Sequence, residues 1–147
     1  MPDGRTNDKE LVQKTIEGLL AAIGAKDIKR MMAHYASDVV VFDVKPPFQT
    51  NGAIAWRHTW EACFPYFPDA FGFTIRDMVI HTSGNLAFAH YLFSITGPDK
   101  DHAAMQTWMR ATTGLKFTEG KWKIVHEHGS LPYDPITMQA VSTLEVR

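Results

Sequence analysis

Two histidines at the end of a predicted strand are well suited to acid–base chemistry. His126 and His128 lie two positions apart, so in a strand they share one face with Trp122 and Ile124. Imidazole titrates near neutral pH and can donate a hydrogen bond to a carbonyl oxygen, which makes both histidines candidate catalytic residues. The alternative is a structural role, in which the rings only complete hydrogen bonds inside the core or reach the tail near Tyr133.

Asp43 is the candidate general base. It directly follows the apolar segment 39–42, where partial removal from water would strengthen a carboxylate as a proton acceptor. The alternative is a solvated or capping aspartate beside the Pro46-Pro47 turn. Asp43 could also join the two histidines in a metal site, but this would require all three ligands in register. We expect no metal and no cofactor, and the single cysteine, Cys63, excludes a cysteine-rich zinc site.

The elements that would position these residues follow from hydrophobic periodicity. Helical spacing predicts helices over 7–24 and 27–35, and a third from residue 51 or 52 whose stripe is Trp56, Trp60, Cys63, Phe64 and Phe67. Strands are predicted over 39–42, 73–81, 85–96, 104–117 and 121–128, with hairpin turns at Ser83-Gly84 and Glu119-Gly120. The tail, 131–147, is predicted to be extended, with a short helix through 138 and 141. This order predicts helices packed on one face of a curved sheet, an α+β domain.

Hairpin register assigns side chains to the two faces of the last two long strands. A two-residue loop at Glu119-Gly120 would place Thr113 opposite His126 and Ala111 opposite His128, on the inner face. A β-bulge would reverse the faces beyond it. With the third helix, this inner face predicts a ligand-binding wall formed by Trp56, Trp60, Met109, Thr113 and Trp122. The outer face would carry Trp108, Arg110 and Glu127, with an Arg110–Glu127 ion pair, and we expect it to form a homodimer interface.

Composition limits the classes of protein to which the chain can belong. It has 147 residues, 45% of them hydrophobic, a net charge of −1 and both signs scattered. This predicts one globular domain over 1–147, with its core at about 8–130. The absence of a basic run argues against nucleic-acid binding, and no apolar stretch is long enough to span a membrane. The polar start lacks the apolar core of a signal peptide, so we expect a cytoplasmic protein.

Three stretches resemble the SnoaL-like branch of the nuclear transport factor 2-like superfamily, which includes ketosteroid isomerases and polyketide cyclases. The resemblance covers residues 8 to 135 approximately, and it rests on 42–47 with Gly52 shortly after, 109–115 and 119–130. It implies a conical α+β barrel, in which a curved, mixed and mostly antiparallel sheet and three helices enclose a deep pocket. It also implies that Asp43 occupies the place of the isomerases' acidic base, whereas their tyrosine and protonated acid have no clear match here.

The resulting functional hypothesis is a cofactor-independent isomerase, cyclase or lyase acting on an apolar carbonyl compound. Asp43 would remove a proton α to the carbonyl, and His126 or His128 would donate to the enolate oxygen. One alternative is a non-catalytic binding module for a small hydrophobic molecule. Another is a dimeric assembly domain, because one fold of this kind hosts many functions.

Overall fold

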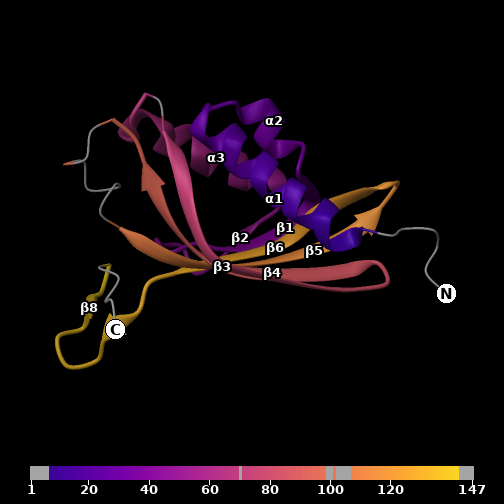
Figure 1. Cartoon of the computed structure of the whole chain (residues 1–147). Helices are drawn as coiled ribbons and strands as arrows, with labels where there is room; N and C mark the ends of the chain where they lie inside the picture. The colour runs from indigo at the N-terminus through magenta and orange to yellow at the C-terminus, as the bar shows by residue number, and fades with distance from the viewer. Residues whose placement is uncertain (1–6, 70, 99–100, 102–106, 143–147) are drawn as a thin grey trace.

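Three helices cover one face of a strongly bent six-stranded sheet (Figure 1). The computed structural model describes residues 7–69, 71–98, 101 and 107–142. The helices are α1 (Asp8–Gly24), α2 (Ile28–Met32) and α3 (Ala53–Cys63), and a 3₁₀ turn, Phe64–Tyr66, follows α3. The long strands are β1 (Tyr35–Phe42), β3 (Gly72–Ser83), β4 (Leu86–Thr96), β5 (Trp108–Thr118) and β6 (Lys121–Ser130). The short strand β2 (Thr50–Asn51) lies at one edge.

The sheet is mixed, as the resemblance to the SnoaL-like branch implied. Its strand order is β2-β1-β6-β5-β4-β3, in which β1 runs parallel to β6 and every other neighbouring pair is antiparallel. The parallel β1–β6 pair brings the end of β1, where Asp43 follows, beside the end of β6. The fold therefore places the two candidate catalytic segments next to each other.

The helices form for the reasons that the sequence suggested, with one correction. The apolar stripe of α1 is buried against the sheet, and Asp27 caps α2 by accepting a hydrogen bond from the backbone of Arg30 at 3.1 Å. The helix α1 ends at Gly24 as predicted, but the left-handed conformation that often follows a helix is at Lys26 rather than at this glycine. Gly24 is required because a Cβ there would lie 2.3 Å from the carbonyl oxygen of Phe71.

The hydrophobic core lies between the helices and the inner face of the sheet. Its buried members include residues from α1, α2, α3 and every long strand except β3, namely Val12, Ile16, Met31, Val39, Trp56, Ala89, Leu115 and Ile124 among others. The inner face therefore alternates with an outer face along each strand.

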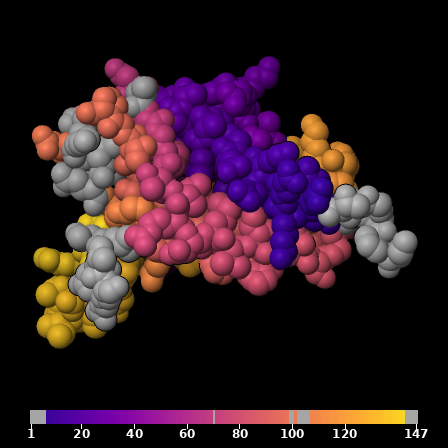
Figure 2. Space-filling view, in the orientation of Figure 1, coloured from indigo at the N-terminus to yellow at the C-terminus, as the bar shows by residue number. Residues whose placement is uncertain are grey.

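Two sequence predictions about chain ends and turns differ from the structure. The β3–β4 turn is at Gly84-Asn85 rather than Ser83-Gly84, because Ser83 pairs with Leu86. The expected helix in the tail is a hairpin of β7 (Tyr133–Asp134) and β8 (Gln139–Ala140), which projects from the body (Figures 1 and 2). The first residues of the predicted strand 104–117, at 104–106, lie outside the described residues.

Candidate functional site

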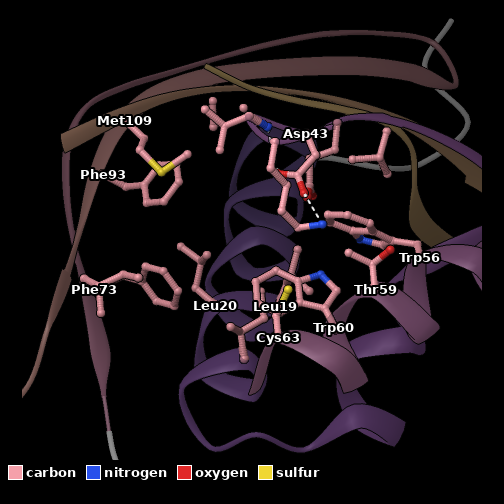
Figure 3. Close-up of a pocket in the computed structure, with 18 of the residues that line it drawn as sticks. Leu19, Leu20, Asp43, Trp56, Thr59, Trp60, Cys63, Phe73, Phe93 and Met109 are labelled. Carbon is pink, nitrogen blue, oxygen red and sulfur yellow. Dashed lines mark hydrogen bonds and ion pairs between the residues drawn. The ribbon is translucent and has the colours of Figure 1, made fainter. Parts of the chain in front are cut away.

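An apolar cavity of about 230 Å³ lies between the helices and the inner face of the sheet. Its walls are mostly aromatic and aliphatic. The side chains labelled in Figure 3 come from α1, α3 and the strands β3, β4 and β5, except Asp43, which follows β1. The aromatic part of the lining is Phe42, Trp56, Trp60, Phe67, Phe71, Phe73, Tyr91 and Phe93. Such a wall favours an apolar ligand, and the few polar groups within it determine the chemistry.

Asp43 lies at one end of this cavity, where β1 ends. Its carboxylate accepts a 2.8 Å hydrogen bond from the backbone N–H of Val44, and the other oxygen lies 3.8 Å from Lys45 Nζ (Figure 3). The side chain is 21% exposed, and it also lines a second, more open hollow of about 620 Å³. Asp43 thus lies between the apolar cavity and the more open hollow, and it can act on a ligand without being fully buried.

Glu127 is the second carboxyl group of the cavity lining. Tyr35, itself buried, has its hydroxyl oxygen 3.0 Å from both carboxylate oxygens of Glu127 and donates to them. Burial raises the pKa of Glu127, the Tyr35 hydrogen bond lowers it, and the nearby charge of Asp43 raises it, so that this pKa is about 7. Glu127 can therefore exist both protonated and ionised near neutral pH, as a proton-transferring group requires.

A β-bulge at Val125 is the reason that Glu127, and not the histidines, faces the cavity. The pairing is regular as far as Leu115 with Ile124, but the next pair is Gly114 with His126, so Val125 has no partner. One extra residue reverses the faces beyond it. The predicted pairings of Thr113 with His126 and Ala111 with His128 are therefore wrong.

The two histidines lie on the outer face of the sheet. His126 Nδ1 donates a 2.7 Å hydrogen bond to the carbonyl oxygen of Val40, and its ring packs edge-on against Phe42 at 4.7 Å. The ring of His128 also packs edge-on against Phe42, with the ring centroids 5.4 Å apart, and His128 lines the open hollow beside Asp43. The prediction that both histidines share an inner wall with Asp43 is wrong, because neither lines the apolar cavity.

The residues predicted to bind a ligand divide into two groups. Trp56, Trp60 and Met109 line the cavity, and Figure 3 shows both tryptophans projecting from α3 into its interior. Thr113 and Trp122 are 1% and 5% exposed and belong to the core rather than to the cavity lining. The helical stripe of α3 is therefore both core and cavity wall, and it includes Cys63 as a lining residue.

Trp60 presents a buried hydrogen-bond donor. Its indole Nε1 is inaccessible to solvent, and no acceptor in the described chain lies within hydrogen-bonding geometry of it. The ring itself is packed edge-on against Trp56 at 5.7 Å and lies 5.3 Å from Phe64 and 6.1 Å from Phe67. A buried donor without an acceptor is costly and is uncommon in proteins.

Of the three residues predicted to form an interface on the outer face, one, Glu127, does not lie on that face. Arg110 is on that face and donates from Nε to Ser130 Oγ at 3.0 Å, and Trp108 has the guanidinium of Arg76 5.9 Å from its ring centroid. Glu127 lies on the opposite face, so the expected Arg110–Glu127 ion pair is wrong. The homodimer stays a prediction.

The described residues contain no group of three or more histidine, cysteine, aspartate or glutamate side chains that could hold a metal ion. The metal alternative required Asp43, His126 and His128 together, and the bulge directs the histidines away from the cavity. Within the described part of the chain, no helix has the length and apolar character needed to cross a membrane.

The sequence matches the SnoaL-like domain over residues 12–134, and the fold agrees with this match. The chain belongs to the SnoaL-like family, within the nuclear transport factor 2-like superfamily. No curated protein matches the sequence.

Solved structures agree with this assignment. A nuclear transport factor 2-like protein of unknown function from Pseudomonas putida KT2440 is 32% identical, with 97% of this chain and 99% of that chain covered and a TM-score of 0.87. A protein with a cystatin-like fold from Nostoc punctiforme PCC 73102 is 14% identical over 89% and 94% of the two chains, with a TM-score of 0.73. A candidate dehydratase from Streptomyces avermitilis is 17% identical over 88% and 97%, also with a TM-score of 0.73.

Sequence reasoning missed three polar residues that the fold brings to this region. Glu127 was placed on the wrong face, and Tyr35 was counted only as an apolar residue of the second helix, although it begins β1. Tyr91 also lines the cavity, and burial, followed by the charge of Glu127, raises its pKa. The sequence does show one acidic residue, Glu127, between the two histidines. Its position on the inner face could be inferred only with knowledge of the bulge.

Proposed function

We propose that this protein catalyses proton transfer on a small apolar carbonyl compound bound in the apolar cavity between the helices and the sheet. The observation that carries the proposal is the pair of carboxyl groups, Asp43 and Glu127, in an otherwise largely apolar lining. Two carboxyl groups in different environments provide an acid and a base at the same pH. The family assignment supports an activity on small molecules, and the aromatic walls support an apolar substrate.

Asp43 is the proton acceptor in this mechanism. Its carboxylate accepts a hydrogen bond from the backbone of Val44 and lies 3.8 Å from Lys45 Nζ, and these contacts orient it to accept a proton from the carbon α to the carbonyl group. The resulting carboxylic acid returns the proton to the same carbon or to a conjugated carbon. Asp43 is then ionised again, so the cycle needs no other reactant.

Glu127 is the hydrogen-bond donor to the carbonyl oxygen. With a pKa of about 7, a large fraction of this group is protonated near neutral pH, and the protonated carboxyl group can donate to the oxygen as negative charge develops there. This role replaces the one predicted for His126 or His128. Tyr35 holds the carboxyl group in place through its hydroxyl group.

The proposal is tested by deuterium exchange, which detects proton removal without requiring that the final product be known. We would incubate small one-ring and two-ring ketones with the protein in deuterated buffer near neutral pH and follow loss of the α-proton signals by NMR. The wild-type protein should accelerate exchange, and Asp43→Asn should reduce the rate about 100-fold or more, because a positioned base contributes at least that factor.

Asp38→Asn is the matched control, because Asp38 is an exposed aspartate on the same strand β1. It should leave exchange unchanged. Binding of a ketone by the wild-type protein without any acceleration of exchange would contradict catalysis and favour a non-catalytic binding module. Equal exchange in the wild-type protein and Asp43→Asn would remove Asp43 from the mechanism.

A further inference from the structure

We propose that two copies of this chain form a dimer in which the tail arm of each copy covers the open hollow beside Asp43 of the other. The tail arm is residues 131–142, which include the hairpin of β7 and β8, and the hollow is the space of about 620 Å³ lined by 42–49 and His128. This assembly does not depend on the proposed reaction. Its supports are the apolar surface of the arm, the position of arm and hollow at one end of the sheet, and the side chains that line the hollow.

The tail arm carries large apolar side chains that its own chain leaves exposed. Tyr133 is 60% exposed, Ile136 is 91% exposed and Met138 is 73% exposed. Asp134 is the single charged residue of the arm. A two-stranded hairpin by itself is only marginally stable in water, and neighbouring exposed apolar residues mark an interaction surface. The arm therefore requires another surface on which to pack.

The described body of the same chain does not supply this surface. The arm begins where β6 ends, and its far end is tied to the start of β5, because the Trp108 N–H donates a 2.9 Å hydrogen bond to the carbonyl oxygen of Ser142. Between these two attachments the hairpin projects from the body (Figures 1 and 2). Since both ends are fixed, the surface that covers the arm has to belong to another molecule.

The tail arm and the hollow lie at the same end of the sheet. Phe42, at the end of β1, pairs with His128, and Ser130, at the end of β6, pairs with Arg110 near the start of β5. A two-fold axis near this end would bring each arm to the hollow of the other copy and would bury both surfaces at once. A foreign partner on the arm would leave the hollow open. A second copy of this chain is therefore the occupant that fits.

The hollow matches the tail arm in chemistry and in size. Its lining includes Val44 and Phe48, which are exposed apolar side chains like those of the arm. Lys45 also lines it, with a half-exposed side chain that offers a cationic partner to Asp134. The arm has 12 residues and nine residues line the hollow. Together they reach the roughly 20–30 residues a side of a stable interface.

The first test measures the mass of the protein in solution by light scattering at micromolar concentrations. The wild-type protein should have twice the 16.6 kDa mass of the chain. The double variant Ile136→Asp, Met138→Asp should raise the dimer dissociation constant about 100-fold or more, because two apolar contacts are lost in each half of a two-fold interface. Both positions are exposed in the single chain, so the variant should fold normally.

Leu86→Asp is the matched control for the arm variant. Leu86 is also an exposed apolar residue, but it pairs with Lys116 at the opposite end of the sheet. This variant should dimerise like the wild-type protein. The proposal is overturned by a monomeric wild-type protein, by an arm variant that remains dimeric, or by an equal loss of dimer in Leu86→Asp.

A cross-linking experiment tests which surfaces meet. In a Cys63→Ala background, which removes the single native cysteine, Phe48→Cys and Met138→Cys would be combined on one chain and treated with a short bismaleimide. A covalent dimer should form, and it should form much less with either single variant. An internal cross-link within one chain would mean that the arm folds onto its own hollow. That result, the absence of any cross-link, or equal dimer from a single variant would contradict the exchange of arms.

Discussion

Three effects determine the pKa of Glu127, and with it the charge of this side chain. Burial raises its pKa, the Tyr35 hydroxyl lowers it by stabilising the carboxylate, and the charge of Asp43 raises it again, with a resulting pKa of about 7. Tyr35 is therefore a positioning residue that also limits how far this pKa rises. Its own pKa is raised well above the usual range by burial and by the charge of Glu127, so it remains a donor at all physiological pH values.

Replacing Tyr35 by phenylalanine should raise the pKa of Glu127 by about one unit, because a hydrogen bond to a charged group is lost. The pKa can be measured directly by titrating the ¹³C-labelled carboxyl signal of Glu127 with NMR. A purely structural role for Tyr35 would leave this pKa near its wild-type value, and that result would contradict the assignment.

At the scale of elements, the hairpin of β5 and β6 presents Glu127 to the cavity. Its turn, Glu119-Gly120, has φ values of 53° and 80°, the pattern of a two-residue hairpin loop in which both residues are left-handed. Glycine accepts this conformation easily, whereas glutamate is strained in it. The turn thus fixes the register of the hairpin, although the left-handed conformation of Glu119 is unfavourable.

Glu119→Asn should stabilise the protein by about 0.5–1 kcal/mol, because asparagine tolerates the left-handed conformation better than glutamate does. Urea unfolding would measure this change. Gly120→Ala is the opposing variant and should be destabilising, because alanine is disfavoured at a φ of 80°. Equal stability of all three proteins would show that the turn carries no strain.

In this same hairpin, some features could be predicted from the sequence and others could not. The predicted turn at Glu119-Gly120 is confirmed. It pairs Phe117 with Trp122 and Leu115 with Ile124, because a two-residue loop determines register. The bulge at Val125 could not be predicted, because a single extra residue leaves no mark in an alternating pattern. A second irregularity, between Arg76 and Val79 in β3, could not be predicted for the same reason.

For the whole molecule, the family and the fold class were predictable, because they depend on the order of elements and on long motifs. The cavity was predictable in part, through the apolar stripe of α3 that supplies Trp56 and Trp60. Its polar lining was not fully predictable. Tyr35 and Glu127 lie 92 positions apart in sequence and meet only through the parallel pairing of β1 with β6.

A buried carboxyl group of this kind affects the stability of the whole molecule. The pKa of Glu127 rises from 4.5 to about 7, so between these values the folded state binds more protons than the unfolded state. The free energy of unfolding therefore falls as pH rises through this window, and the loss persists above it. Glu127→Gln should be as stable as wild type below pH 4.5 and more stable by about 2–3 kcal/mol well above pH 7.

Urea unfolding of both proteins at several pH values would measure this difference, and Glu61→Gln, at an exposed site, is the control. A constant difference between wild type and Glu127→Gln across the window would show that Glu127 does not titrate there.

The pH dependence of ketone α-proton exchange in wild type and Glu127→Gln tests the central claim most directly. After subtraction of the exchange without protein, the wild-type rate should fall as pH rises through about 7, because Glu127 loses the proton that it donates. Glu127→Gln should retain a weaker activity without this decline, since an amide donates at every pH. A wild-type rate that is constant through this range, or an unchanged decline in Glu127→Gln, would contradict the role assigned to Glu127.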